Sequence, residues 1–161
     1  MGLAQYITKK TSGQRGKLVA LGEEHHFRKF NSLHGWMERN VGDIGNEEDL
    51  IVPRSAWKEL LALCDRLLPY KSLLVEAMIE DRFSNGRKYL DTVILDPDAL
   101  RVLKAEMPLT EGCFFGEYDH YKPSFFEDLE DLKKLLTTEI LNPGNKDYDD
   151  RRVVYTYLAW W

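Results

Sequence analysis

The chain has 161 residues, of which 43% are hydrophobic and 30% are charged, and its net charge is −5 at pH 7. This length suits one domain of about 100–200 residues, and the acidic balance argues against general nucleic-acid binding, which needs clustered lysine and arginine. No apolar run approaches the ~20 residues that span a bilayer, and residues 1–10 lack the apolar core of a signal peptide. We therefore expect a cytosolic protein that does not bind membranes.

The first half of the chain alternates between short extended segments and helical stripes. Residues 27–41 place apolar side chains at helical spacing, and the glycines of the segment 42–46 end that pattern. Pro53 suits the first turn of a following helix, because its missing N–H has no helical partner there. We expect strands at 3–9 and 18–21, and helices at 27–41 and 53–69.

The second half contains the clearest local signals. Ser124 and Glu127 have the spacing of a capping box, in which each side chain satisfies a backbone donor of the first helical turn. Asn85-Gly86 is typical of a tight turn, and Asp96 or Asp98 lies near the start of a helix. We expect a short helix at 73–83, a strand at 92–95, a helix at 98–106, a strand at 110–116, a helix at 124–140 and a terminal strand at 151–161.

This order of elements predicts an α+β fold. We expect a single domain over residues 1–161, with a largely antiparallel sheet and about three main helices packed on one face. The predicted core includes Phe27, Phe30, Met37, Trp57, Leu61, Phe114, Leu129 and Leu132.

The segment 27–41 contains the polar cluster most typical of a site. On a helix, Asn31, His34 and Glu38 are separated by three- and four-residue steps, so they share one edge at the rim of the apolar stripe. Such a cluster could orient a ligand or a water molecule. Alternatively, His34 is a core histidine that bonds to Asn31, Glu38 or a backbone carbonyl.

Two aromatic segments have a functional and a structural interpretation. The strand 112–119 contains glycines that let a ligand come close, although it also suits a core strand with a tight turn. Trp160 and Trp161 face opposite sides of a terminal strand, so at most one joins a given face. An exposed aromatic residue can stack a base, or these residues can anchor the C-terminus.

The cysteine and histidine spacing does not indicate a metal site. The two cysteines lack near partners, and the four histidines lack the spacing of zinc ligands. Cys64 lies in an apolar helical stripe and is most simply a small buried hydrophobe. We expect no metal and no cofactor.

Several short motifs together resemble a family of small, uncharacterised phage-encoded proteins. Members start MGLDMY, carry an aromatic-Arg-Lys element before Leu-His-x-Trp, then a Thr-Gly-Phe-Phe-Phe-Gly element, and end in Ser-Trp-Trp. The matching residues here are Met1-Gly2-Leu3 with Tyr6, Phe27-Arg28-Lys29, Asn31, Leu33-His34, Trp36, the segment 110–116, and Trp160-Trp161. Ala4 and Gln5 replace the usual Asp and Met, and Leu158-Ala159 the usual Asp-Ser. Some members are labelled phosphoglycerate kinase, but this chain is too short for that two-domain enzyme.

The resemblance implies a phage protein. Because small phage proteins without catalytic motifs often block host defence, we expect an accessory protein that counters host defence; a virion- or scaffold-associated protein is a further alternative. Two versions stay open: docking on a host defence protein, such as a CRISPR effector, or sequestering a nucleotide signal. The alternative is a small hydrolase or nucleotide-modifying enzyme that uses His34 and Glu38 as acid and base. The expected ligand is a nucleotide-like anion, and the expected ligand-binding residues are Arg28, Lys29, Asn31, His34, Trp36, Glu38 and Trp160.

Overall fold

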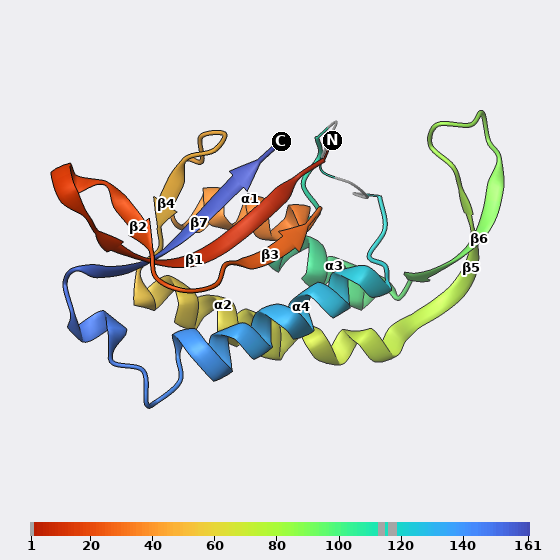
Figure 1. Cartoon of the computed structure of the whole chain (residues 1–161). Helices are drawn as coiled ribbons and strands as arrows, with labels where there is room; N and C mark the ends of the chain where they lie inside the picture. Colours follow the sequence, from red (N-terminus) through yellow and green to blue (C-terminus); the bar gives the residue numbers. More distant parts are fainter. Residues whose placement is uncertain (1, 113–114, 116–118) are drawn as a thin grey trace.

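The computed structural model describes residues 2–112, 115 and 119–161, and it has the α+β architecture that the sequence predicts (Figure 1). Its main sheet is antiparallel and contains β1 (Ala4–Ser12), β2 (Leu18–Ala20), β3 (His25–Arg28), β4 (Asp49–Ile51) and β7 (Val153–Trp160). The helices are α1 (Asn31–Asn40), α2 (Arg54–Leu67), α3 (Pro97–Glu106) and α4 (Pro123–Leu135), with a π turn (Leu136–Ile140) extending α4. A separate hairpin is formed by β5 (Leu74–Glu80) and β6 (Lys88–Ile94). Short 3₁₀ turns are η1 (Gln14–Gly16), η2 (Leu68–Leu73) and η4 (Asp147–Asp149).

The alternation of side chains along β1 and β7 defines the two faces of the sheet. The two strands run antiparallel, with Gln5 opposite Ala159 and Ile7 opposite Tyr157, and all four of these residues are buried. This inner face packs on the helices (Figure 1). Because successive side chains point to opposite sides, the even-numbered residues form the outer face. Trp160 lies there and is 47% exposed.

The predicted helix over residues 27–41 begins four residues late, which is a correction to the sequence analysis. Phe27 pairs with Gln5, and Arg28 pairs with Ala4, so both residues belong to β3. Lys29 then adopts a left-handed backbone with φ of 59°, and α1 starts at Asn31. The apolar spacing was compatible with a helix, but pairing with β1 decided the conformation, as tertiary context often does.

Three further expectations are corrected or fall outside the described residues. The segment 73–83 is mostly strand β5, which pairs along its full length with β6. Ser124 is not a helix cap, because α4 already begins at Pro123. The N-cap residue is Lys122, and its side chain makes no capping bond. The predicted strand 110–116 is absent at residues 110–112 and 115, and its remaining residues lie outside the described part of the chain.

The other elements and most of the predicted core are confirmed. Helices α2, α3 and α4 and strand β7 lie within two residues of their predicted starts. Asp96 caps α3 by accepting a hydrogen bond from the Ala99 N–H at 2.9 Å. The predicted core residues Phe27, Phe30, Met37, Trp57, Leu129 and Leu132 are buried, Leu61 is half-buried, and Phe114 lies outside the described residues.

The β5–β6 hairpin projects from the body of the molecule (Figure 1). One of its faces contains the buried residues Ile79 and Val93. The other face and the tip expose apolar side chains: Met78 is 60% exposed, Leu90 is 61% exposed and Phe83 is 86% exposed.

Candidate anion-binding cleft

Three of the predicted ligand-binding residues line one cleft, which we call the anion cleft. Its volume is about 290 Å³. The segment Arg28–Ser32 forms one side, and the other side is formed by Leu109, His120, Lys122, Ser124, Phe125 and Asp128. The cleft therefore lies where β3 turns into α1 and where α4 begins.

Two helix starts contribute to this cleft. Asn31 and Ser32 are the first residues of α1, and Ser124 is the second residue of α4. In neither helix does the N-cap side chain bond to the first turn. The N–H groups at a helix start carry partial positive charge, although those of Leu33 and Phe125 bond to the Phe30 and Lys122 carbonyls at 3.1 Å, and Pro123 has no N–H. This charge favours an anion between the two helices.

Two cations at the rim of the cleft lack a counter-ion among the residues that the structure describes. Arg28 and Lys29 are exposed, and neither forms an ion pair there. Lys122 differs, because its ammonium lies 2.9 Å from the Asp91 carboxylate and 5.7 Å from the centre of the Tyr89 ring. Arg28 and Lys29 are thus the cations available to a bound anion.

Ser32 supplies an unsatisfied hydroxyl in the wall of the cleft. The residue is 1% exposed, and its Oγ has no hydrogen-bond partner among the described residues. Buried polar groups in native proteins are almost always bonded, so an exception calls for an explanation. A ligand oxygen in the cleft provides one, and Ser32 lies where such an oxygen would also meet the start of α1.

Asp128 gives the cleft a titratable group. Burial, together with the negative charges of Asp131 and Glu127, raises the pKa of the Asp128 carboxyl to about 7. It forms no ion pair with the described residues. Ionised Asp128 would repel an anion and protonated Asp128 would not, so occupancy of the cleft is expected to depend on pH near neutrality.

Gln5 holds the backbone of the cleft in place, although it was not among the predicted site residues. Its amide oxygen accepts from the Phe30 N–H at 2.9 Å, and its Nε2 donates to the Phe30 carbonyl at 2.9 Å. Nε2 also donates to the Tyr157 hydroxyl at 2.8 Å. The sequence contained a signal, because Gln5 shares a strand face with Leu3 and Ile7, and a polar residue at such a position must be buried and bonded.

Asn31 also has a structural role at the edge of the cleft. Its Oδ1 accepts from the Thr110 N–H at 3.2 Å, and its Nδ2 donates to the Phe115 carbonyl at 3.1 Å. These bonds fix Thr110 and Phe115 against the start of α1.

The structure places His34 in the core. It is 1% exposed, and its ring meets the edges of Phe115 and Trp161 at 5.0 and 5.1 Å between centroids. Nδ1 lies 3.1 Å from the Tyr157 hydroxyl, and Nε2 lies 3.6 Å from the Glu38 carboxylate. Burial lowers the pKa of His34 to about 4, so the ring is neutral at pH 7.

The remaining predicted residues lie apart from the anion cleft. Trp36 is buried in the core, and the Glu38 side chain is 46% exposed beside His34. Trp160 projects from the outer face of the sheet, whereas Trp161 packs inward against His34. This confirms that the two tryptophans face opposite sides.

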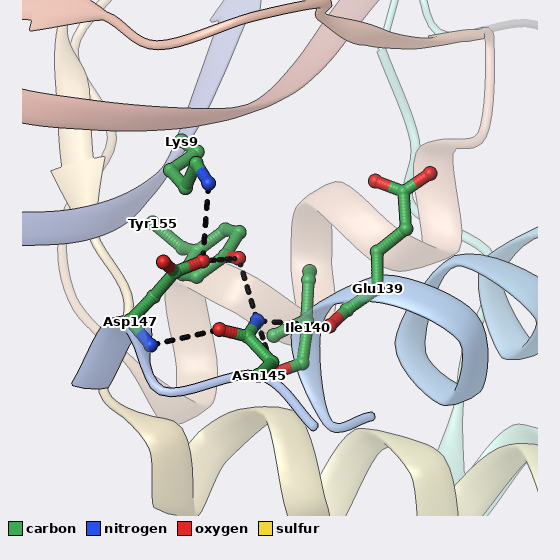
Figure 2. A network of polar contacts seen from close by, with 6 residues as sticks. All are labelled: Lys9, Glu139, Ile140, Asn145, Asp147 and Tyr155. Atoms are coloured by element: carbon green, nitrogen blue, oxygen red, sulfur yellow. Dashed lines mark hydrogen bonds and ion pairs between the residues drawn. The ribbon is translucent and has the colours of Figure 1, made fainter. Parts of the chain in front are cut away.

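A larger cleft of about 710 Å³ lies between the inner face of β1 and the chain after α4. Figure 2 shows its polar network, in which the Asp147 carboxylate accepts from the Tyr155 hydroxyl at 2.6 Å and from Lys9 at 3.2 Å. Asn145 donates to the Tyr155 hydroxyl at 2.9 Å, and it donates to the Glu139 carbonyl at the same distance. Burial alone would raise the pKa of Asp147, but its hydrogen bonds to Tyr155 and Lys9 outweigh burial and lower that pKa. Because these groups satisfy one another's hydrogen-bonding capacity, we interpret the network as a structural contact that holds the chain after α4 against the sheet.

Within the described residues, no group of three or more His, Cys, Asp or Glu side chains is placed to hold a metal ion. Among the same residues, every helix is too short or too polar to cross a membrane. No protein-family model, curated protein or solved structure was found to match this chain.

Proposed function

We propose that this protein is a phage accessory protein that counters host defence by binding, without catalysis, a nucleotide-like signal in the cytosol of the infected bacterium. The phage assignment rests on the motif resemblance, and the ligand class rests on the anion cleft. The main support is the buried Ser32 hydroxyl, which has no hydrogen-bond partner among the described residues and lies beside two helix starts without side-chain caps. Arg28 and Lys29 add two positive charges at the rim of that cleft.

The ligand chemistry follows from these groups. Backbone N–H groups at a helix start and a serine hydroxyl donate hydrogen bonds to phosphate oxygens. The Arg28 guanidinium can donate two parallel bonds to one phosphate, and Lys29 adds a point charge. A net acidic protein with these cations beside two helix starts is suited to a compact phosphate group rather than to a long polyanion.

Calorimetric titration with inorganic phosphate, AMP and cyclic dinucleotides tests this proposal. We expect saturable binding that weakens as salt is added. Arg28→Ala/Lys29→Ala should lose at least about 10-fold in affinity, because even one hydrogen bond to a charged group contributes about 1.5–3 kcal/mol, or roughly 10- to 150-fold. Ser32→Ala should lose less, since a single neutral hydroxyl is removed.

The matched control is Lys58→Ala/Lys104→Ala, which removes two exposed positive charges from α2 and α3, outside the cleft residues. This variant has the same net charge as Arg28→Ala/Lys29→Ala and should bind normally. Equal affinity in the cleft variant and the wild-type protein would refute the anion cleft.

Docking on a host defence protein is a second candidate, and the β5–β6 hairpin favours it. Met78, Phe83 and Leu90 are each at least 60% exposed on a projecting arm. Exposed apolar groups of this kind mark interaction sites when they are contiguous, and the net charge of −5 would steer the protein toward a basic partner such as a CRISPR effector.

Phage plating on a host that carries a defence system separates the two candidates. If a nucleotide signal is sequestered, Arg28→Ala/Lys29→Ala abolishes protection and Met78→Ser/Phe83→Ser/Leu90→Ser retains it. If a protein is docked on the hairpin, the outcomes are reversed.

The enzymatic alternative receives little support from this geometry. A general acid or base must come within hydrogen-bond reach of the proton that it transfers. His34 is 1% exposed, and its ring nitrogens already face Tyr157 and Glu38. It lines none of the clefts described above.

A further inference from the structure

The outer face of the sheet brings three residues into one row, which we call the slot, and one of these residues also lines the anion cleft. Ala4 pairs with Trp160 on one side and with Arg28 on the other. These three residues therefore form one row across β7, β1 and β3, and their side chains point to the same face. Ala4 has the smallest side chain of the three. The surface of the sheet is therefore lower over Ala4 than over Trp160 and Arg28 at the two ends of the row.

The width of this slot suits a flat ring. Neighbouring strands lie about 4.8 Å apart, so the Cα atoms of Trp160 and Arg28 are separated by about 10 Å. A planar group in contact with two flat neighbours needs roughly 7–8 Å between them, because carbon contacts are optimal at about 3.5–4.0 Å. The indole of Trp160 and the guanidinium of Arg28 can thus hold one aromatic ring between them, above the methyl group of Ala4.

The next row of the sheet closes one side of the slot. Tyr6 is opposite both Leu158 and His26. The rings of Tyr6 and His26 are stacked, with centroids 4.9 Å apart and an angle of 22° between their planes. The stacked rings of Tyr6 and His26 therefore border the slot on one side. Trp160, at one end of the slot, is 47% exposed.

Arg28 connects this slot to the anion cleft, because it lies in the row over Ala4 and also lines the cleft. We propose that the slot receives the base of a nucleotide whose phosphate lies in the anion cleft, an inference that rests on the proposed function. The base stacks on Trp160, and Arg28 covers its other face by a cation–π contact. The ligand class is then a nucleotide rather than a simple anion.

Calorimetry with two probes, inorganic phosphate and AMP, tests the slot. Replacing an aromatic side chain that stacks on one base typically lowers the affinity about 5- to 150-fold. We expect AMP to bind at least about 10-fold more tightly than phosphate. Trp160→Ala should remove most of that difference and leave phosphate affinity unchanged.

Ala4→Val provides a second variant that fills the slot instead of removing its wall. Valine is well accommodated in strands, and the two added methyl groups occupy the space of the ring. This variant should also bind phosphate normally and AMP no more tightly than phosphate. Phe83→Ala is the matched control for Trp160→Ala, because it removes an aromatic side chain that is 86% exposed on the distant hairpin.

The outcomes distinguish this inference from the proposed function. If the wild-type protein binds phosphate but binds AMP equally, the slot is wrong and the anion cleft stands. Unchanged AMP affinity in both Trp160→Ala and Ala4→Val would also refute the slot and leave the anion cleft in place. If neither probe binds, the proposed function and the slot both fail.

Discussion

Replacing Gln5 by methionine tests the role of the buried amide that supports the anion cleft. Methionine has a similar length and shape, and it removes all three hydrogen bonds that Gln5 makes. Gln5 is 0% exposed, so water cannot replace the lost bonds without opening the sheet. The variant therefore isolates the hydrogen bonding of this side chain from its packing.

The magnitude follows from which partners stay satisfied. The Phe30 carbonyl retains bonds from the N–H groups of Leu33 at 3.1 Å and His34 at 3.3 Å, so its loss is small. The Tyr157 hydroxyl retains its contact with His34 at 3.1 Å. The Phe30 N–H has Gln5 as its partner and would be left unsatisfied. A buried unsatisfied donor costs about 1–3 kcal/mol, and the lost bond to Tyr157 adds about 1 kcal/mol. We expect a total loss of about 2–4 kcal/mol in the free energy of unfolding.

Equilibrium unfolding in urea, monitored by circular dichroism, measures this difference through the midpoint at an unchanged slope. Gln14→Met is the matched control, because residue 14 is the same amino acid in an exposed position and should change stability by less than about 0.5 kcal/mol. A Gln5→Met protein within about 0.5 kcal/mol of the wild type would refute the reasoning. The variant should also bind phosphate more weakly, since the Phe30 peptide lies in the wall of the cleft.

The remaining predictions concern two ionisable groups, the partly exposed Asp128 and the buried Cys64. The pKa of Asp128 is about 7, against an ordinary value of 3.8, so its contribution to stability is lost as the pH rises from about 4 to 7. Asp128→Asn should be more stable than the wild type at pH 8 by about 1–2 kcal/mol, less than the ~4 kcal/mol that the pKa shift represents, because water screens the partly exposed carboxyl. The wild-type protein should bind sulfate, whose charge is constant in this range, more tightly at pH 6 than at pH 8, and Asp128→Asn should lose that dependence; a wild-type affinity independent of pH would contradict this. Burial, together with the charge of Asp65, raises the pKa of the Cys64 thiol to about 12, so iodoacetamide at pH 8 should label Cys64 only after unfolding, as peptide mapping would reveal. Cys64→Ala should cost about 1–2 kcal/mol and leave anion binding intact, and loss of binding in a folded variant would reopen thiol chemistry.

The sequence by itself determined the elements whose signals are local. The stripe of α2 and the proline before it predicted that helix, and the aspartates at 96 and 98 indicated the start of α3 without deciding which of them caps it. The alternation of the terminal segment predicted β7 and the opposite orientation of Trp160 and Trp161. These signals are sufficient because hydrogen-bonded caps and the periodicity of 2 or 3.6 residues act within one element.

The tertiary structure alone decided the elements whose partners are distant in the chain. Phe27 and Arg28 fit a helical stripe, and they became strand because they pair with Gln5 and Ala4 of β1. The segment from Leu74 was compatible with a helix, and its pairing with β6 made it a strand. Ser124 carried the residue type of a cap, but Pro123 occupied the first helical position before it.

The candidate site divides in the same way. The sequence identified Arg28, Lys29 and Asn31 as candidate binding residues, because charged and amide groups near a helix start indicate anion recognition. It could not show that α4 begins beside them, nor that His34 is buried among aromatic rings. The sequence gives the chemistry of each side chain, whereas its exposure and its neighbours depend on contacts between distant residues, such as Gln5 and Tyr157, which are 152 positions apart.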